Sequence, residues 1–310
     1  MFFMIEQLKL EQLKSKLECP ADELAFYTKE PMNRHTSFRI GGPADLLIMP
    51  KTERAVCCAV KAAKQAELPL TVLGNGSNVL VRDEGIRGVV LCIGTEYGNV
   101  QIDGTTVQAQ TGALLSVLAS EALKNELTGL EFAGGIPGSL GGALFMDAGA
   151  YGGQMADVVV SSRYYDAQTD TIGTLNGKEH AFGYRTSAYK DHPQWVALSA
   201  TLQLQTGDPA EIKAKMDDFS QRRRDKQPLN YPSAGSTFKR PEGYFAGKLI
   251  QDAGLMGYTV GGAQVSEKHA GFVINRGGAT CADVLAVIDH VREEVLRQFG
   301  VELEPEVRLL

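Results

Sequence analysis

The stretch Gly134-Gly135-Ile136-Pro137-Gly138-Ser139-Leu140-Gly141-Gly142 sets five glycines around one proline. Glycine tolerates positive φ and lets a ligand approach the main chain, so such a loop exposes backbone N–H groups that can hold a pyrophosphate. A second turn, Gly74-Asn75-Gly76-Ser77-Asn78, can do the same from another side. Neither stretch has the glycine spacing of a Rossmann fingerprint, and the sequence has no Walker A loop. A glycine-rich stretch alone is more often a tight turn, so each loop needs further support.

The segments around the second turn predict the architecture. A helix is expected over 52–67, where Thr52 caps it and Pro69 stops it, and a strand follows at 71–73. This order of helix, strand and Gly/Asn turn favours an α/β arrangement. An amphipathic helix is expected at 4–17. Between residues 88 and 204 we expect a turn-rich α+β region, with a helix at 113–126 and short strands at 89–93, 107–110, 158–160 and 196–198.

The last helix carries its own start and stop signals. It is expected over 282–299, where Thr280 and Asp283 form a capping box and Gly300 ends the helix. One face of this helix is apolar and should be buried, through Val284, Val287, Ile288, Val291 and Val295. A strand-like segment is expected at 301–310.

Length and charge bound the class of protein. A chain of 310 residues is long enough for about two domains. A strongly charged helix between residues 209 and 228 leads into a loop rich in Pro, Gly and Ser, and we place a domain boundary near residue 205. The sequence has 31 basic and 37 acidic residues, a balance that argues against binding nucleic acid by phosphate neutralisation.

The cysteines and the first residues indicate a reducing compartment. The cysteines have neither the even count nor the spacing of a disulfide framework or a zinc site, and we expect them to be small buried hydrophobes: Cys19, Cys57, Cys58, Cys92 and Cys281. The start of the chain lacks the basic and long apolar segments of a secretory signal, and no run is long enough to span a bilayer. We expect a cytoplasmic protein with no metal and no membrane partner.

A longer motif resembles a known family. Asn33-Arg34-His35-Thr36-Ser37-Phe38-Arg39-Ile40-Gly41-Gly42-Pro43-Ala44-Asp45 is similar to the entry motif of the UDP-N-acetylenolpyruvoylglucosamine reductases. Further blocks that look like the family's signatures follow in its order: Leu73 to Asn78, Gly134 to Gly142, Gly149-Ala150-Tyr151-Gly152, Tyr184-Arg185-Thr186-Ser187, Gly235-Ser236-Thr237-Phe238-Lys239-Arg240-Pro241 and Glu304-Pro305-Glu306-Val307-Arg308. Each block is a weak signal, but the ordered set is specific and covers nearly the whole chain from residue 30.

The resemblance implies a fold and a reaction. The fold is α+β: an FAD-binding domain of the PCMH or vanillyl-alcohol-oxidase type in two subdomains, plus a C-terminal α+β substrate-binding domain. We expect an N-terminal helical segment at 1–30, the FAD domain at 31–205 and the substrate domain at 206–310. The family reduces UDP-N-acetylglucosamine enolpyruvate to UDP-N-acetylmuramate, a peptidoglycan precursor, with bound FAD and with NADPH as reductant. The short spacing from Arg185 to Ser236 is typical of the family's compact second class, and we expect a monomer.

The resemblance also assigns three catalytic residues. Ser236 is the proton donor, while Arg185 and Glu306 stabilise the enolate that forms beside the substrate carboxylate. Arginine suits this task because its planar guanidinium binds a carboxylate bidentately and stays charged. Read without the resemblance, Arg185 would be a structural ion pair, Ser236 a loop residue and Glu306 a solvated surface carboxylate.

Further residues are expected to bind ligands. The resemblance places substrate at Tyr184, Lys226 and Arg240, with the nicotinamide cofactor as the alternative ligand of Lys226. It places FAD at Gly74, Asn75, Gly76, Ser77, Asn78, Gly135, Ile136, Pro137, Gly138, Ser139, Gly141 and Gly142. Lys226 is equally typical of a solvated helix end. Asp147 departs from the family, which has asparagine there, and His269 receives no chemical role.

Two other functions remain open on the sequence. One is a different flavin oxidoreductase of the same fold, which would give no reason for Arg185, Ser236 and Glu306 to occur together. The other is a non-catalytic flavin or UDP-sugar binding protein, which could dispense with the acid pair.

Overall fold

A computed structural model describes residues 11–13 and 15–310, and the chain divides into two compact units. Of the described residues, those up to 28 together with 46–75 and 88–221 form the first unit, and 29–45, 76–87 and 222–310 form the second. Each unit therefore combines segments that lie far apart in the sequence. The compact units begin and end at other residues than the predicted domains 1–30, 31–205 and 206–310. The predicted domains are functional divisions of the chain, and they stay a prediction.

The predicted helix at 4–17 falls mostly outside the described residues. Residues 4–10 and 14 are not described, while residues 11–13 and 15–16 are helical. Leu13 is fully buried in the same apolar core as the helix over 53–65.

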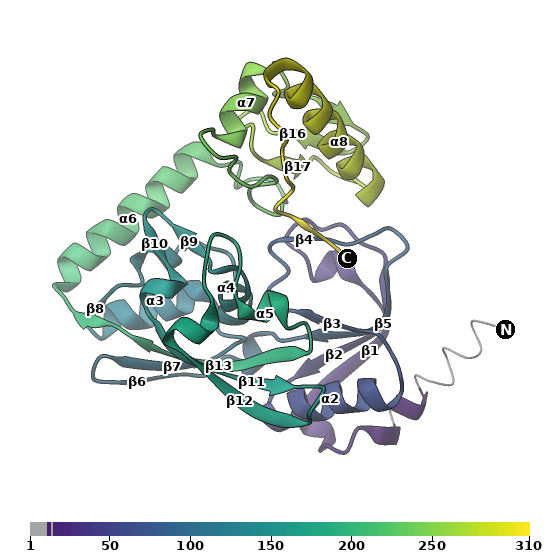
Figure 1. The fold of residues 1–310 in the computed structure, drawn as a ribbon, viewed down its shortest axis with the longest axis vertical. Coiled ribbons are helices and arrows are strands. Elements are labelled where there is room, and N and C mark those ends of the chain that lie inside the picture. The colour runs from purple at the N-terminus through teal and green to yellow at the C-terminus, as the bar shows by residue number, and fades with distance from the viewer. Residues whose placement is uncertain (1–10, 14) are drawn as a thin grey trace. The chain divides into compact units, whose positions relative to one another are not determined.

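A four-stranded sheet and one helix form the first layer of the first unit (Figure 1). The strand order is β1 (Leu24–Pro31), β2 (Pro43–Pro50), β5 (Ile86–Cys92) and β3 (Leu70–Leu73). β3 and β5 run parallel, as expected for strands joined through a crossover. Helix α2 (Glu53–Gln65) begins at Thr52, whose hydroxyl accepts a hydrogen bond from Ala55 N at 3.1 Å, so the predicted cap is confirmed. Its alanine- and valine-rich face packs into one core with Leu46, Ile48 and Leu91.

A five-stranded antiparallel sheet forms the second part of this unit. Its order is β12 (Thr171–Asn176), β11 (Val159–Asp166), β13 (Trp195–Gln203), β7 (Thr106–Gln110) and β6 (Val100–Asp103). Helices α3 (Leu115–Lys124) and α4 (Leu140–Met146) pack into a core with β7 and β13. The strands predicted at 107–110, 158–160 and 196–198 are present, and the last two belong to longer strands. The β11–β12 hairpin was not predicted.

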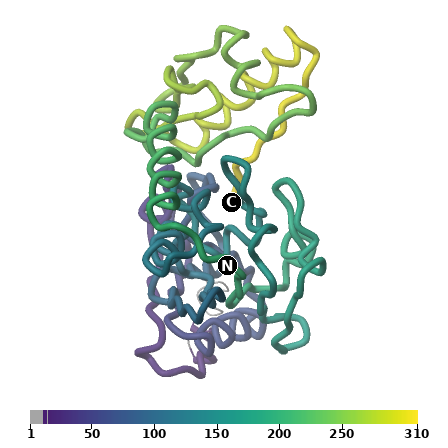
Figure 2. Tube along the Cα trace, turned by 90° about the vertical axis from the view of Figure 1, so that its left-hand side faces the viewer, coloured from purple at the N-terminus to yellow at the C-terminus, as the bar shows by residue number. Residues whose placement is uncertain are grey.

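Short elements complete the first unit. These are strands β8 (Leu127–Thr128), β9 (Gly149–Ala150), β10 (Gly153–Gln154) and β14 (Gln205–Thr206), and helix α5 (Ala188–Asp191). Helix α6 (Pro209–Lys226) confirms the predicted charged helix and runs without a break in the tube of Figure 2. Its first turns belong to the first unit, where Tyr151 stacks on Phe219 with ring centroids 4.5 Å apart.

Two helices and a small sheet form the core of the second unit. The antiparallel sheet has the order β15 (Thr259–Val260), β16 (Ala263–Val265) and β17 (Val273–Asn275), and the helices are α7 (Ala246–Asp252) and α8 (Cys281–Phe299). α8 begins with the predicted Thr280–Asp283 capping box and ends at Gly300 with φ of 67°. All five residues of its predicted apolar face are buried.

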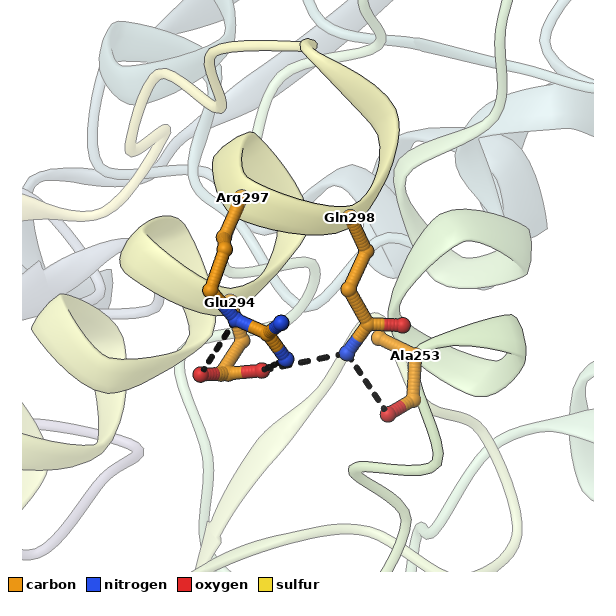
Figure 3. A network of polar contacts seen from close by, with 4 residues as sticks. All are labelled: Ala253, Glu294, Arg297 and Gln298. Atoms are coloured by element: carbon orange, nitrogen blue, oxygen red, sulfur yellow. Dashed lines mark hydrogen bonds and ion pairs between the residues drawn. The ribbon is translucent and has the colours of Figure 1, made fainter.

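The C-terminal turn of α8 is fastened to the end of α7 (Figure 3). Gln298 donates to the carbonyl of Ala253, the residue that follows α7, at 3.4 Å and to the carboxylate of Glu294 at 3.1 Å. Arg297 pairs with the same carboxylate at 2.6 Å, which lowers the pKa of Glu294 to about 2. The two helices are thereby held side by side at one end.

Two expectations about local structure are corrected. The strand-like segment at 301–310 is a strand only at β18 (Arg308–Leu309), which pairs in parallel with β4 (Val79–Leu80). Only Cys92 and Cys281 are buried. The other three cysteines are partly exposed, since Cys19 and Cys57 lie at the margin of the apolar core and Cys58 lies outside it; all five are free thiols. Among the described residues no helix is long and apolar enough to cross a membrane.

Candidate active site

The two glycine-rich stretches meet in the first unit. Asn75 Nδ2 donates to the carbonyl of Pro137 at 2.6 Å. A Cβ on Gly74 would overlap with the hydroxyl of Ser139 in its present position, so glycine at position 74 leaves room for that hydroxyl where the two loops approach each other. The structure therefore brings together parts of both predicted phosphate loops.

Ser139 carries an unsatisfied hydroxyl between these loops. The residue is 2% exposed, and its Oγ has no hydrogen-bond partner among the described residues. A buried hydroxyl without a partner costs about 1–3 kcal/mol, so this atom is suited to a ligand oxygen. Backbone bonds hold the loop in place, from Leu115 N to Gly138 O at 3.0 Å and from Leu140 N to Ala113 O at 2.8 Å. A phosphate oxygen of a dinucleotide such as FAD fits this donor.

The rest of the second loop belongs to the second unit. Gly76 has φ of 62°, and its carbonyl accepts a hydrogen bond from Ser37 N at 3.0 Å. The side chain of Asn78 donates to the carbonyl of Glu306 at 3.3 Å, and its own carbonyl accepts from Arg308 N at 3.0 Å. Asn78 therefore holds the C-terminal segment, and cofactor contacts from Gly76, Ser77 and Asn78 stay a prediction.

Arg185 lies in a strained turn of the first unit. Its φ is 59°, a value that costs a non-glycine residue of the order of 1 kcal/mol. Two backbone hydrogen bonds between Gly183 and Thr186, of 3.2 and 3.0 Å, close the turn. The guanidinium carbon lies 5.1 Å from the ring centroid of Tyr184, whose side chain is largely exposed. The predicted pair Tyr184–Arg185 thus forms one local structure, and strained turns of this kind often mark functional sites.

The end of α4 supports this turn and carries Asp147. The hydroxyl of Ser187 donates to the carbonyl of Phe145 at 3.0 Å. Asp147 is buried with φ of 42°, and its carboxylate accepts a hydrogen bond from Ala156 N at 2.9 Å. Burial is the main cause that raises the pKa of Asp147, while this hydrogen bond and Arg185 oppose it. An asparagine would keep the same hydrogen bond, since its amide oxygen also accepts.

Ser236 lies on an exposed loop of the second unit whose neighbours are fixed. Gly235 before it has φ of 77°, a conformation that favours glycine. The next residue, Thr237, is buried. Its N–H donates to Gly271 O at 2.9 Å, and its hydroxyl accepts a hydrogen bond from Val273 N at 3.0 Å. The serine is therefore presented outward from a rigid support.

Glu306 returns to the Ser236 loop through backbone pairing. Its N–H donates to the carbonyl of Thr237 at 2.8 Å, and Phe238 forms an antiparallel bridge with Pro305. The structure thus places the segments of Ser236 and Glu306 side by side. Arg185 belongs to the first unit, so its approach to this pair stays a prediction.

Lys226 and His269 are neighbours within the second unit. Gly271 N donates to His269 Nδ1 at 3.1 Å, so the proton of the neutral ring is on Nε2. Burial first, and then the charge of Lys226, lower the pKa of His269 and favour the neutral ring. No chemical role for His269 follows from the sequence, because no local sequence pattern links His269 to Lys226.

Arg240 and Ser37 complete the surroundings of the Ser236 loop. The guanidinium of Arg240 lies over the ring of Phe245 with its carbon 4.0 Å from the centroid, which leaves Arg240 at the surface. Ser37 donates from its hydroxyl to Ser233 O at 2.7 Å. The entry motif at 33–45 therefore supports the Ser236 loop, a role that sequence reasoning did not assign to Ser37.

Within the described part of the chain, no three His, Cys, Asp or Glu side chains form a metal-binding group.

Comparisons with known proteins match both parts of the chain. Residues 227–310 match the profile of the UDP-N-acetylenolpyruvoylglucosamine reductase C-terminal domain, and residues 44–174 match that of an FAD binding domain. A UDP-N-acetylenolpyruvoylglucosamine reductase of Caldanaerobacter subterraneus subsp. tengcongensis is 50% identical over 97% of this chain and 98% of its own length. One of Clostridium perfringens is 52% identical over 92% of this chain and 95% of its own length. The crystal structure of the Thermus caldophilus enzyme of that name is similar with a TM-score of 0.77 at 32% identity, over 92% of this chain and 98% of that one.

Proposed function

The chain belongs to the UDP-N-acetylenolpyruvoylglucosamine reductase family, and we propose that it reduces UDP-N-acetylglucosamine enolpyruvate to UDP-N-acetylmuramate with FAD and NADPH. The observation that carries the proposal is 50% identity over 97% of the chain to a reductase of that name. The pairing of the Ser236 and Glu306 segments supports it. We assign FAD binding to residues 31–205 and substrate binding to residues 206–310, behind an N-terminal segment at 1–30.

The residues of the glycine loops fit FAD. The unsatisfied hydroxyl of Ser139 donates to the pyrophosphate, and Gly74 keeps the space beside that hydroxyl open. The remaining loop residues assigned to FAD are those named from the resemblance, Gly74 to Asn78 and Gly135 to Gly142 without Leu140. FAD held by these residues would accept hydride from NADPH and pass it to the terminal alkene carbon of the substrate.

Arg185 binds the substrate carboxylate. Negative charge spreads into this carboxylate when the alkene is reduced, so a fixed cation stabilises the transition state more than the ground state. The closed turn between Gly183 and Thr186 limits the motion of the Arg185 backbone, and Tyr184 lies against the guanidinium. Preorganisation of this kind is what electrostatic catalysis requires.

Ser236 gives its proton to the neighbouring carbon. A serine hydroxyl is a weak acid, but its proton transfers readily to a strongly basic enolate or carbanion once the two are aligned. The rigid support from Thr237 provides that alignment. Glu306, on the adjacent segment, stabilises the enol form and orients Ser236 or a water molecule.

Lys226 and Arg240 bind the anionic part of the substrate, with Tyr184 beside Arg185. Both cations lie at the surface of the second unit, and a nucleotide diphosphate is the kind of ligand that such side chains recognise. The protein acts as a monomer in the cytoplasm. Light scattering of the purified holoprotein tests whether it is a monomer.

Half-reactions test the function directly. Purified holoprotein should be yellow, NADPH should bleach it under anaerobic conditions, and UDP-N-acetylglucosamine enolpyruvate should restore the colour. A different flavin oxidoreductase would bleach but stay colourless with this substrate. A non-catalytic binding protein would not complete either half-reaction.

A further inference from the structure

An exposed phenylalanine lies against Arg240 in the second unit. Phe245 is 60% exposed, so most of its ring gains nothing from burial in the core. The guanidinium carbon of Arg240 lies 4.0 Å from the centroid of this ring, which is the geometry of a cation–π contact. A single exposed apolar side chain needs no explanation by itself. This one contacts a cation that the family resemblance assigns to substrate binding.

The main chain of the loop over 240–245 is fixed. Tyr244 N donates to the carbonyl of Pro241 at 3.1 Å, which closes a turn in the middle of the loop. Phe245 is the N-cap of α7, and its carbonyl accepts a hydrogen bond from Leu249 N at 3.1 Å. The inner face of α7 belongs to the apolar core of the unit. The ring therefore projects into solvent from a helix start that is itself held in place.

Arg240 is held at two points. Its Nε donates to the carbonyl of Tyr244 at 3.3 Å, and its guanidinium lies over the ring of Phe245. A long side chain that must be ordered by its ligand loses rotamer freedom on binding, and preorganisation avoids that cost. Stacking uses the flat face of a guanidinium, whereas its N–H groups point outward within the plane. That plane is the direction from which arginine binds a phosphate bidentately.

We propose that Phe245 is a positioning residue for Arg240, and that its ring holds the guanidinium in the orientation that binds the diphosphate of the sugar nucleotide. This inference rests on the proposed function, since it assumes that Arg240 binds substrate. Phe245 acts through Arg240 and does not touch the reacting double bond. Its effect should therefore fall on the binding of substrate and not on the chemical step.

Phe245→Ala tests the inference through the split between KM and kcat. An exposed cation–π contact is worth a factor of about 2 to 5 in affinity. We expect KM for UDP-N-acetylglucosamine enolpyruvate to rise about 5-fold, with kcat within about 2-fold of wild type. UDP, used as a competitive inhibitor, should lose affinity by the same factor, because it carries the diphosphate without the enolpyruvyl group. A wild-type KM, or an unchanged inhibition constant for UDP, would overturn the inference.

Two further variants separate the π face of the ring from its apolar bulk. Phe245→Tyr keeps the ring face and should have a KM within about 2-fold of wild type. Phe245→Leu keeps apolar volume without the π system and should behave like Phe245→Ala. A wild-type KM in Phe245→Leu would contradict the proposal. Phe299→Ala, at the exposed last residue of α8, is the control for loss of a surface phenyl ring and should leave KM and kcat unchanged.

A double-mutant cycle shows whether Phe245 acts through Arg240. In an Arg240→Ala background, Phe245→Ala should raise KM by less than about 2-fold further. A full additional rise of about 5-fold in that background would mean that Phe245 acts independently, against the inference. Failure of the proposed function would look different, since saturating enolpyruvyl substrate would then not reoxidise the wild-type flavin at all.

Discussion

Ser236 shows how much a side chain depends on the residues around it. A loop serine after a glycine has no special acidity, and the sequence alone would leave it a turn residue. The structure adds a fixed support, since Thr237 is bonded on both sides, and it adds the Glu306 segment as a neighbour. Its proposed role as proton donor therefore depends on where the hydroxyl is held.

Replacing Ser236 tests the protonation step. Ser236→Ala should slow flavin reoxidation by on the order of 10²-fold or more, because a general acid is lost, while bleaching by NADPH stays nearly unchanged. Stopped-flow absorbance of each half-reaction measures both rates. Ser116→Ala, at an exposed position of α3, is the control. Equal losses in both half-reactions would instead identify Ser236 as a structural residue.

A second serine–histidine contact illustrates the opposite case. Ser162 Oγ lies 2.8 Å from His180 Nε2 and 2.7 Å from the hydroxyl of Tyr189, and all three side chains are buried. His180 Nδ1 also bonds to Gly177 O at 2.9 Å. Such a chain resembles a nucleophile and its base, but a residue with no exposed surface cannot meet a substrate. It is a satisfied polar network that fixes the core.

At the scale of elements, α8 is capped twice. Besides its own capping box, α8 has a second cap at its first turn. The carboxylate of Asp83 accepts hydrogen bonds there from Cys281 N at 2.8 Å and Ala282 N at 3.1 Å. The first N–H groups of a helix have no partner within the helix and are satisfied by side chains, water or a ligand. Here side chains fill them, so this helix end is structural.

Removing that second cap should weaken the second unit. Asp83→Ala should lower the free energy of unfolding by about 1 kcal/mol, as for other lost N-caps. Urea denaturation followed by circular dichroism gives the shift in midpoint. Glu84→Ala, at the next exposed acidic position, serves as control and should have little effect. Similar shifts for both variants would mean that general charge, not capping, is responsible.

Elements with local signals were predicted, and elements defined by distant partners were not. α8 carries its caps, its apolar face and its stop within the helix, so the sequence determined its bounds almost to the residue. The segment 301–310 pairs instead with 237–239 and with β4, and no nearby pattern reveals those partners. The family resemblance named Ser236 and Glu306, but only the fold brings their segments together. Asp147 departs from the family's asparagine, and only the structure shows that this side chain is buried and accepts a hydrogen bond from Ala156 N.

At the scale of the whole molecule, each unit contains a histidine that burial keeps neutral. Burial is the first cause that lowers the pKa of both His180 and His269 from 6.5. Below about pH 6.5 the unfolded chain binds protons that the folded chain does not, so stability falls as the pH falls. The stability that comes from keeping these two histidines neutral is fully present above about pH 6.5.

Acidification should therefore destabilise both units before the carboxylates titrate. Each histidine contributes a slope of at most about 1.4 kcal/mol per pH unit in the free energy of unfolding. Urea titrations at several values between pH 7.5 and pH 5 measure this slope. These limits lie roughly one unit above and 1.5 units below the pKa of histidine in the unfolded chain. His269→Gln should remove the part of this slope that His269 contributes. A free energy of unfolding that stays constant over this range would refute the expectation.

The discontinuous second unit has a consequence for gene design and for recombination. Its core joins α8 to Phe38, Ile40 and Leu80, which lie in the segments 29–45 and 76–87, far earlier in the sequence. A gene fragment that encodes residues 206–310 lacks these side chains as well as the Asp83 cap, so its product would expose apolar surface and aggregate. A single crossover between related genes would separate the same partners. Chimeras that exchange this unit intact need three inserts, at 29–45, 76–87 and 222–310.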